Sequence, residues 1–170
     1  MKKKTKVGAA KKSKVTAPAA KVSGKIHRLE NYQHPDVFGE LLGYEVTAIN
    51  PKKRTATTEL KIRYEHLSPA GRVHGGVISA FFDFACGAAL FPLLAPRDFC
   101  STVELKVNYF RPLELKDHLV AETEVVFKGK RLSVIHGFVY RKGEKDPVAM
   151  ATATYNIVSP QQQVIVPTNQ

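Results

Sequence analysis

Cysteine is scarce in this chain of 170 residues, and its histidines are widely spaced. The two cysteines, Cys86 and Cys100, form no metal-type pair, and no two of the six histidines have the His-x-x-x-His spacing of a zinc site. A Gly-x-Ser-x-Gly nucleophile elbow is also missing. These absences argue against a metal enzyme and a Ser-His-Asp hydrolase. Because nothing requires an oxidising compartment, we expect a cytoplasmic protein that uses no metal and no cofactor.

Acidic residues are missing from the N-terminal segment. Residues 1–25 contain nine lysines and no Asp or Glu. Without these lysines the chain has 17 basic and 15 acidic residues, so the net charge of +11 belongs largely to this segment. Its Lys/Ala/Ser/Thr/Pro composition predicts a disordered tail, either simply solvated or weakly attracted to nucleic acid or anionic lipid. No specific nucleic-acid partner is indicated.

The chain lacks a long uninterrupted hydrophobic run. Its longest apolar stretch, Val77 to Ala95, is interrupted by Asp83 and Pro92, which argues against a membrane span. We expect instead a central helix that begins near Gly75 and reaches about Leu94. Because large apolar residues occur on all its sides, the pattern predicts burial nearly all round.

Strand-like segments surround this helix in sequence. A short helix is expected at Asp36–Gly43, followed by a hairpin of Tyr44–Ile49 and Thr55–Tyr64, with Ala56, Thr58, Leu60, Ile62 and Tyr64 on one face. Four more strands are predicted after the helix: Thr102–Phe110, Leu119–Phe127, Leu132–Tyr140 and Val148–Val158. This order favours an α+β domain over residues 26–160, in which a curved antiparallel sheet wraps around the helix. Residues 161–170 are expected to form a C-terminal tail.

The central helix contains two features with chemical potential. Gly75 and Gly76 lie at its start, where the first amides have no intrahelical partner and a ligand carbonyl can approach the backbone. Such donors stabilise an oxyanion, although two glycines are also usual in a tight turn. Asp83 is a carboxylate inside an apolar helix, where it either acts in chemistry, faces solvent or satisfies a backbone group.

The spacing of Gly75 and Asp83 has a consequence for assembly. Eight residues of helix separate them by roughly 12 Å, so a single ligand carbonyl does not reach both. If both act on one carbonyl, the second must come from another subunit. A two-fold dimer would then have two composite sites.

Two motifs resemble hotdog-fold thioesterases of the phenylacetic-acid-degradation type. They are His74-Gly-Gly-Val-Ile-Ser-Ala-Phe-Phe-Asp83 and the strand Ser101-Thr-Val-Glu-Leu-Lys-Val-Asn-Tyr-Phe-Arg-Pro112. The closing strand Pro147-Val-Ala-Met-Ala-Thr-Ala-Thr-Tyr155 is similar as well. The resemblance covers about residues 36 to 158 and implies a hotdog fold, acyl-CoA hydrolysis, and a homodimer or dimer of dimers.

The resemblance also implies roles for individual residues. The Gly75 amide would polarise the thioester carbonyl, and Asp83 would act as nucleophile or general base. Thr102 would help to position the attacking water, His74 would support the geometry of the loop or of the substrate, and Gly76 would permit close approach of the substrate. Ser68 departs from the pattern, since many relatives have asparagine six residues before the motif histidine. A serine hydroxyl is shorter and has one donor, which puts this position's contribution to catalysis in doubt.

Candidates for substrate binding follow from charge and aromaticity. Arg111, Lys128, Lys130 and Arg131 are candidates for the CoA phosphates, the alternative being that the basic turn is solvated surface. Phe82, with Phe81, Phe84 and Phe91, is a candidate for an acyl pocket, although aromatic residues on a buried helix commonly fill the core.

The sequence therefore favours an acyl-CoA thioesterase. A hotdog dehydratase or hydratase is a weaker alternative, because those relatives need a catalytic His–acid pair in a different motif. A non-catalytic acyl-CoA-binding regulator or scaffold is the alternative from another class, and Ser68 gives it weight. The sequence leaves open the acyl group, the choice of dimer or tetramer, and whether Asp83 attacks directly or through water.

Overall fold

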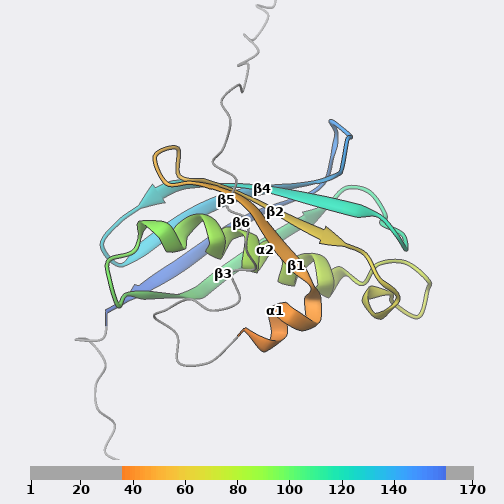
Figure 1. The fold of residues 1–170 in the computed structure, drawn as a ribbon, viewed down its shortest axis with the longest axis horizontal. Helices are drawn as coiled ribbons and strands as arrows, with labels where there is room; N and C mark the ends of the chain where they lie inside the picture. The colour runs from red at the N-terminus through yellow and green to blue at the C-terminus, as the bar shows by residue number, and fades with distance from the viewer. Residues whose placement is uncertain (1–35, 160–170) are drawn as a thin grey trace, which may run out of the picture.

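The computed structural model describes residues 36–159, so the tails predicted at 1–25 and 161–170 lie outside it. Along the chain the elements are α1 (Val37–Leu42), β1 (Tyr44–Asn50), β2 (Thr55–Lys61), η1 (Tyr64–His66), α2 (Gly75–Leu90), η2 (Phe91–Leu93), β3 (Phe99–Tyr109), β4 (His118–Lys128), β5 (Leu132–Arg141) and β6 (Pro147–Val158). The strands form one antiparallel sheet in the order β1-β2-β4-β5-β6-β3. The sheet curves around α2, as the sequence predicts (Figure 1).

The short helix α1 is bounded by the residues expected from the sequence. The Asp36 carboxylate accepts hydrogen bonds from the Gly39 amide at 2.8 Å and from the Tyr44 hydroxyl at 2.9 Å. Gly43 ends the helix in the left-handed region, with φ of 77°, a conformation that glycine adopts without strain. The Tyr44 ring stacks on Phe84 of α2 with centroids 4.6 Å apart, which anchors this end of the chain against the central helix.

One side of α2 packs against the concave face of the sheet. Phe81 and Phe82 are fully buried, and Phe82 lies over Gly137 of β5, where a Cβ would be 3.2 Å from its ring. The N-terminal half of the helix packs with Leu60, Leu119 and Val139, whereas the C-terminal half packs with Ala56, Val125 and Ile135. By length and composition alone, Gly75–Leu93 is apolar enough to cross a membrane. Its contacts are those of a core helix.

The prediction that α2 is buried nearly all round is wrong. Gly76 is exposed, and Ser79, Ala80, Asp83 and Gly87 are half-buried, along a stripe of the helix that the sheet covers only in part. We call these five residues the open stripe. Since the sheet covers only one side of the helix, the open stripe is available for contact with another molecule. The helix also ends at Leu90, before the 3-10 turn that contains Pro92, and not at Leu94.

Strand β2 ends earlier than expected. Ala56, Thr58, Leu60 and Ile62 are buried as predicted, but the Tyr64 side chain is 78% exposed. The alternation stops because β2 ends at Lys61 and Tyr64 begins the 3-10 turn η1.

Strand β3 is an edge strand with a bulge. Thr102 pairs with Tyr155 of β6, but Glu104 pairs with Thr154, so Val103 is an extra residue. A bulge changes the side on which the following side chains lie. As a result, both Thr102 and Tyr109 point toward α2, although seven positions separate them.

Candidate active site

The first turn of α2 leaves the Gly75 amide available. His74 caps the helix: its Nδ1 accepts a hydrogen bond from the Gly76 N–H at 2.9 Å, and its carbonyl accepts one from Val77 at 3.0 Å. Within residues 36–159 the Gly75 N–H has no acceptor. A free, outward-pointing amide at a helix start can stabilise negative charge on a ligand oxygen.

A tyrosine that the sequence reasoning missed restrains the peptide that follows this amide. The Tyr109 hydroxyl donates to the Gly75 carbonyl at 3.0 Å and lies 2.7 Å from the Ser79 Oγ. His74 therefore holds the N–H end of the Gly75–Gly76 peptide, and Tyr109 holds its carbonyl end. The conformation of the chain around the Gly75 donor is restrained before any ligand arrives.

The absence of a side chain at Gly76 leaves room for the His74 side chain that caps α2. A Cβ at this position would lie 2.9 Å from the His74 Nδ1, closer than such atoms approach in proteins. A Cβ at Gly75 would make only an ordinary contact, 3.5 Å from the Tyr109 hydroxyl oxygen. Gly76 thus makes room for the His74 ring, and the substrate approach expected from the sequence stays a prediction.

Asp83 is held by two hydroxyl groups. Its Oδ1 accepts hydrogen bonds from the Thr102 Oγ1 at 2.7 Å and from the Tyr155 hydroxyl at 2.8 Å, and Tyr155 also lies 2.6 Å from the Asp83 carbonyl oxygen. Burial raises the pKa of Tyr155, aided by the charge of nearby Asp83, so its hydroxyl stays protonated as a donor. The Asp83 Oδ2 has no hydrogen-bond partner within the described part of the chain. One carboxylate oxygen is anchored and the other is free to react.

Tyr155 carries a signal that sequence reasoning can find. It occupies an inward position of β6 in line with Ala151 and Ala153, which are buried against α2. A buried tyrosine hydroxyl usually finds a hydrogen-bond partner. Asp83, the one carboxylate in the facing helix, is therefore the expected partner of Tyr155. The bulge that brings Thr102 to the same oxygen has no comparable signal in the sequence.

His66 supports the loop before α2. Its carbonyl accepts from the His74 N–H at 2.9 Å, and its Nδ1 accepts from the Arg63 N–H at 3.1 Å. Burial, together with the charge of Arg63, lowers the pKa of the His66 imidazole, which favours its neutral form. The ring is 4% exposed and belongs to the structural frame of the His74 cap.

Two of the predicted site residues make no hydrogen bond to Gly75 or Asp83 within residues 36–159. Ser68 closes a turn through its backbone, with its N–H 2.7 Å from the Arg72 carbonyl oxygen, and its hydroxyl makes no hydrogen bond within residues 36–159. Phe82, expected in an acyl pocket, fills the core under α2 with Phe81, because both point toward the sheet. Phe84 and Phe91 are half-buried.

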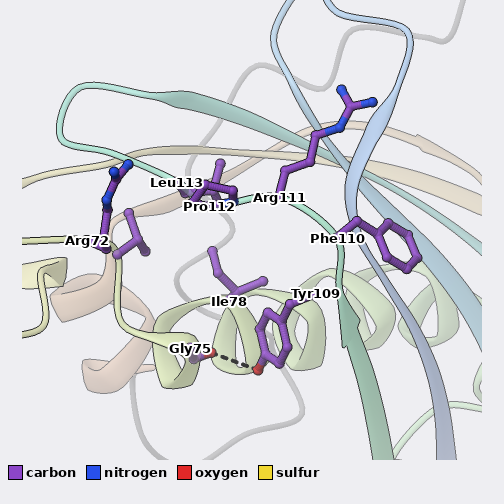
Figure 2. A pocket seen from close by; sticks show the side chains of 9 residues that line it. Arg72, Gly75, Ile78, Tyr109, Phe110, Arg111, Pro112 and Leu113 are labelled. Carbon is purple, nitrogen blue, oxygen red and sulfur yellow. Dashed lines mark hydrogen bonds between the residues drawn. The ribbon is translucent and has the colours of Figure 1, made fainter. Parts of the chain in front are cut away.

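A pocket of about 360 Å³ opens beside Gly75. Figure 2 shows Arg72 and Arg111 on opposite sides of this pocket, with Ile78 between them and the Tyr109–Gly75 hydrogen bond at its edge. Val73, Phe110, Pro112 and Leu113 complete the lining. Arg111 was expected near the substrate, whereas Arg72 was not singled out, because an isolated arginine in a loop carries no sequence signal.

The other predicted phosphate ligands lie elsewhere in the subunit. Lys128 ends β4, and Lys130 and Arg131 lie in the turn before β5, near Val125 and Ile135, which pack on the C-terminal half of α2. Gly75 and Arg111 are at the other end of the helix. Within one subunit these three cations therefore do not join Arg111. No group of three or more His, Cys, Asp or Glu side chains suited to a metal ion occurs in residues 36–159.

The class of protein follows from the fold and its structural relatives. The fold matches a phenylacetic-acid-degradation-related protein from Ralstonia eutropha JMP134, described as a candidate thioesterase, with TM-score 0.66 and 23% identity over 71% of this chain and 89% of that one. It also matches a variant of the phenylacetic acid degradation protein PaaI from Thermus thermophilus, with TM-score 0.63 and 27% identity over 71% and 98% of the chains. The chain has a hotdog fold.

The sequence comparisons point to the same class of protein. The model of the "Thioesterase superfamily" matches residues 70–148, which include the His74 cap, Asp83 and Thr102. A candidate esterase of Archaeoglobus fulgidus is 26% identical, over 79% of this chain and 95% of its own length. The family model and the structural neighbours support a hotdog-fold thioesterase, as the sequence motifs predict. Thioester hydrolysis is the activity that these comparisons support.

Proposed function

We propose that the protein hydrolyses an acyl-CoA to a free acid and CoA. The observation that carries the proposal is the state of Asp83, whose Oδ1 is held by Thr102 and Tyr155 while its Oδ2 has no partner among the described residues. Such an anchored carboxylate is suited to remove a proton from water or to attack a carbonyl. The unpaired Gly75 amide is the complementary donor for the oxyanion that forms.

The two groups are best combined across a dimer. Gly75 and Asp83 are separated by eight residues of α2, roughly 12 Å, and belong to one helix. If the Gly75 of one subunit meets the Asp83 of its partner, the two helices run antiparallel and the two-fold axis passes near Ser79, midway between them. The open stripe supports this arrangement, since Gly76, Ser79, Ala80 and Gly87 are small enough to let two helices approach closely.

The edge of the sheet supports the same pairing. β3 lies at one end of the strand order, and within residues 36–159 it pairs with β6 alone. Its Val103 side chain is 61% exposed. Edge strands with exposed apolar residues are templates for pairing with a second chain. A dimer, alone or within a tetramer, would cover this edge and the open stripe together.

In the proposed mechanism, the thioester carbonyl oxygen accepts the Gly75 N–H of one subunit. A water molecule loses a proton to the Asp83 Oδ2 of the partner while its oxygen attacks the carbonyl carbon. Collapse of the tetrahedral intermediate breaks the C–S bond, and Asp83 returns the proton to the departing thiolate. Direct attack by Oδ2 would instead give a mixed anhydride, which water then hydrolyses. A single turnover in ¹⁸O-labelled water followed by mass spectrometry separates these routes, because only direct attack leaves label in Asp83.

The antiparallel pairing also changes the interpretation of the basic turn. It brings the C-terminal end of one α2 to the N-terminal end of the other. Lys128, Lys130 and Arg131 of one subunit then lie at the same end of the dimer as Arg111 of its partner. The four cations expected to bind CoA phosphates thus contribute from both subunits.

The test is release of free thiol from a panel of acyl-CoAs by the wild type, Asp83→Ala and Asp83→Asn. Asparagine keeps the size and an acceptor oxygen but not the basicity, so both variants should lose at least about a hundredfold in turnover. Glu45→Gln on β1 is the matched control at an exposed acid and should behave as the wild type. Near-wild-type turnover by Asp83→Asn contradicts the mechanism.

A non-catalytic acyl-CoA-binding protein is the second candidate. Ser68 is the observation in its favour, because its hydroxyl makes no hydrogen bond within residues 36–159. This candidate predicts that the wild type binds acyl-CoA without releasing thiol. Calorimetric binding in parallel with the thiol assay separates the two.

A further inference from the structure

Three loops meet at one end of the sheet, on the left of Figure 1. The turn between β1 and β2 lies beside the end of β4, since Thr55 pairs with Glu124 and the Val125 N–H donates to the Arg54 carbonyl at 2.9 Å. The turn between β4 and β5 follows directly. The start of β5 pairs with the end of β6, which pairs with the start of β3, so the loop before β3 reaches the same end.

This end of the domain has an excess of positive charge. Asp98, whose carboxylate accepts a hydrogen bond from the Ser159 hydroxyl at 2.7 Å, and Glu124 are the two acids near the loops among residues 36–159. Residues 36–159 contain 16 basic and 14 acidic side chains, so the remainder of the domain has more acids than bases. The seven basic side chains at this end, which we call the basic end, are Lys52, Lys53, Arg54, Arg97, Lys128, Lys130 and Arg131. None of the seven forms an ion pair within the described residues.

Large apolar side chains are exposed among these cations. Val126 is an extra residue in a bulge of β4, so Val126 and Phe127 follow each other at the surface, 46% and 55% exposed. Leu132, across the turn, is 45% exposed. Gly129 lies against both sides of the turn, because a Cβ on it would be 3.2 Å from the Phe127 ring and 3.1 Å from the Leu132 carbonyl oxygen. We call Val126, Phe127 and Leu132 the apolar tip.

The combination of cations and apolar side chains favours one kind of partner. An anionic membrane attracts lysine and arginine, and its headgroup layer accepts apolar side chains that water does not. Nucleic acid would also attract the cations. Bases stack on aromatic rings, however, and Val126 and Leu132 offer no such surface.

We propose that the basic end and the apolar tip together form a docking surface for an anionic lipid membrane. The apolar tip enters the headgroup layer, while the cations around it face the lipid phosphates. The net charge of +11 on the whole chain strengthens the attraction. This surface goes beyond the proposed hydrolysis: the proposed CoA contacts use Lys128, Lys130 and Arg131, but no residue of the apolar tip.

The experiment measures sedimentation of the full chain with vesicles of phosphatidylcholine alone or of equal parts phosphatidylcholine and phosphatidylglycerol. The wild type should bind only the anionic vesicles, and salt should weaken this binding. The double variant Phe127→Ser, Leu132→Ser should bind at least about tenfold more weakly, because it loses the burial of two half-exposed apolar side chains. The double variant Lys130→Gln, Arg131→Gln should lose about fivefold for each charge.

Two matched controls lie at the other end of the sheet. Leu41→Ser on α1 replaces a leucine that is 67% exposed. The double variant Lys116→Gln, Lys145→Gln removes two exposed charges from the turns before β4 and β6. Both should bind anionic vesicles as the wild type does.

A fluorescent probe reports insertion without weakening the surface. The chain has no tryptophan, so Phe127→Trp introduces a single one. Its emission should shift to the blue with anionic vesicles and be quenched by brominated lipids. Tyr64→Trp, on a ring that is 78% exposed away from the basic end, should show neither change.

Several results would overturn the proposal. Vesicle binding that depends on the cations but not on the apolar tip would indicate diffuse attraction without a docking surface. A lower molecular mass of Phe127→Ser, Leu132→Ser in solution would assign the tip to a contact between subunits. Tip-dependent binding to a DNA oligonucleotide, with none to vesicles, would assign it to nucleic acid.

The membrane proposal and the catalytic proposal fail in different ways. Asp83→Ala should bind anionic vesicles as the wild type does, because Asp83 is not part of the surface. The double variant Phe127→Ser, Leu132→Ser should release thiol from a soluble acyl-CoA at the wild-type rate, which also shows that it is folded. Vesicle binding by a protein that releases no thiol would contradict hydrolysis alone, and full turnover without vesicle binding would contradict the docking surface alone.

Discussion

Replacing Gly75 by proline removes the proposed oxyanion donor and little else. Proline is well tolerated at the first position of a helix, where its missing N–H has no helical partner to lose. The preceding residue must be extended, and His74 already is, with φ of −67° and ψ of 134°. Gly75→Ala is the matched variant, because it adds the same Cβ and keeps the N–H. That Cβ would lie 3.5 Å from the Tyr109 hydroxyl oxygen, an ordinary contact.

The expected difference between the two variants is large. Removing one donor from an oxyanion hole lowers kcat by about 10² to 10³, equivalent to about 2.7–4 kcal/mol of transition-state stabilisation. Gly75→Pro should therefore be slower than Gly75→Ala by this factor in thiol release. Thermal unfolding followed by circular dichroism should give similar Tm values for the two. If Gly75→Pro turns over as fast as Gly75→Ala while folded, the Gly75 amide is not the oxyanion donor.

Three further predictions concern the residues that hold the site. Tyr109→Phe loses the hydroxyl that restrains the Gly75–Gly76 peptide, so kcat should fall about tenfold with KM unchanged. Tyr64→Phe, on an exposed ring, should leave both constants unchanged. A change confined to KM in Tyr109→Phe would contradict the positioning role. Gly76→Ala places a Cβ 2.9 Å from the His74 Nδ1. This variant should lower the free energy of unfolding by about 1 kcal/mol, the usual value of a helix cap. An unchanged denaturant midpoint would show that His74 caps the helix equally well beside an alanine. Burial lowers the pKa of His66 in the folded state, so the unfolded chain binds the proton more readily and the free energy of unfolding should decrease as the pH falls below the ordinary value of 6.5. His66→Asn should show a smaller decrease over the same range in pH-dependent urea denaturation, and an unchanged slope would assign the effect to another group.

Local sequence signals were sufficient to predict most elements of the fold. Asp36 and Gly43 mark the ends of α1, and alternating apolar residues mark the buried face of β2 up to Ile62. The side of α2 that stays open was not predictable in this way. Ala80 and Gly87 are small and apolar whether they pack in a core or against a second subunit, so residue type does not distinguish the two.

The candidate site was predictable only in part. The motif supplies Gly75, Asp83 and Thr102, and the structure gives Asp83 and Thr102 a direct hydrogen bond. Tyr109 reaches Gly75 because a bulge in β3 changes the facing of every residue after Val103. Such a register shift depends on the neighbouring strand and has no local sequence signature. The pocket rim likewise depends on how two distant loops come together.

The most direct test of the composite site mixes two inactive subunits. Asp83→Ala keeps a normal Gly75 amide, and Gly75→Pro keeps a normal Asp83. If each site takes Gly75 from one subunit and Asp83 from the other, a mixed dimer contains one intact site and one that lacks both groups. Half of the dimers are mixed after random exchange, so thiol release should recover to about a quarter of the wild-type rate. Activity that stays at the level of the separate variants, with subunit exchange verified by native mass spectrometry, would contradict a site built from two chains.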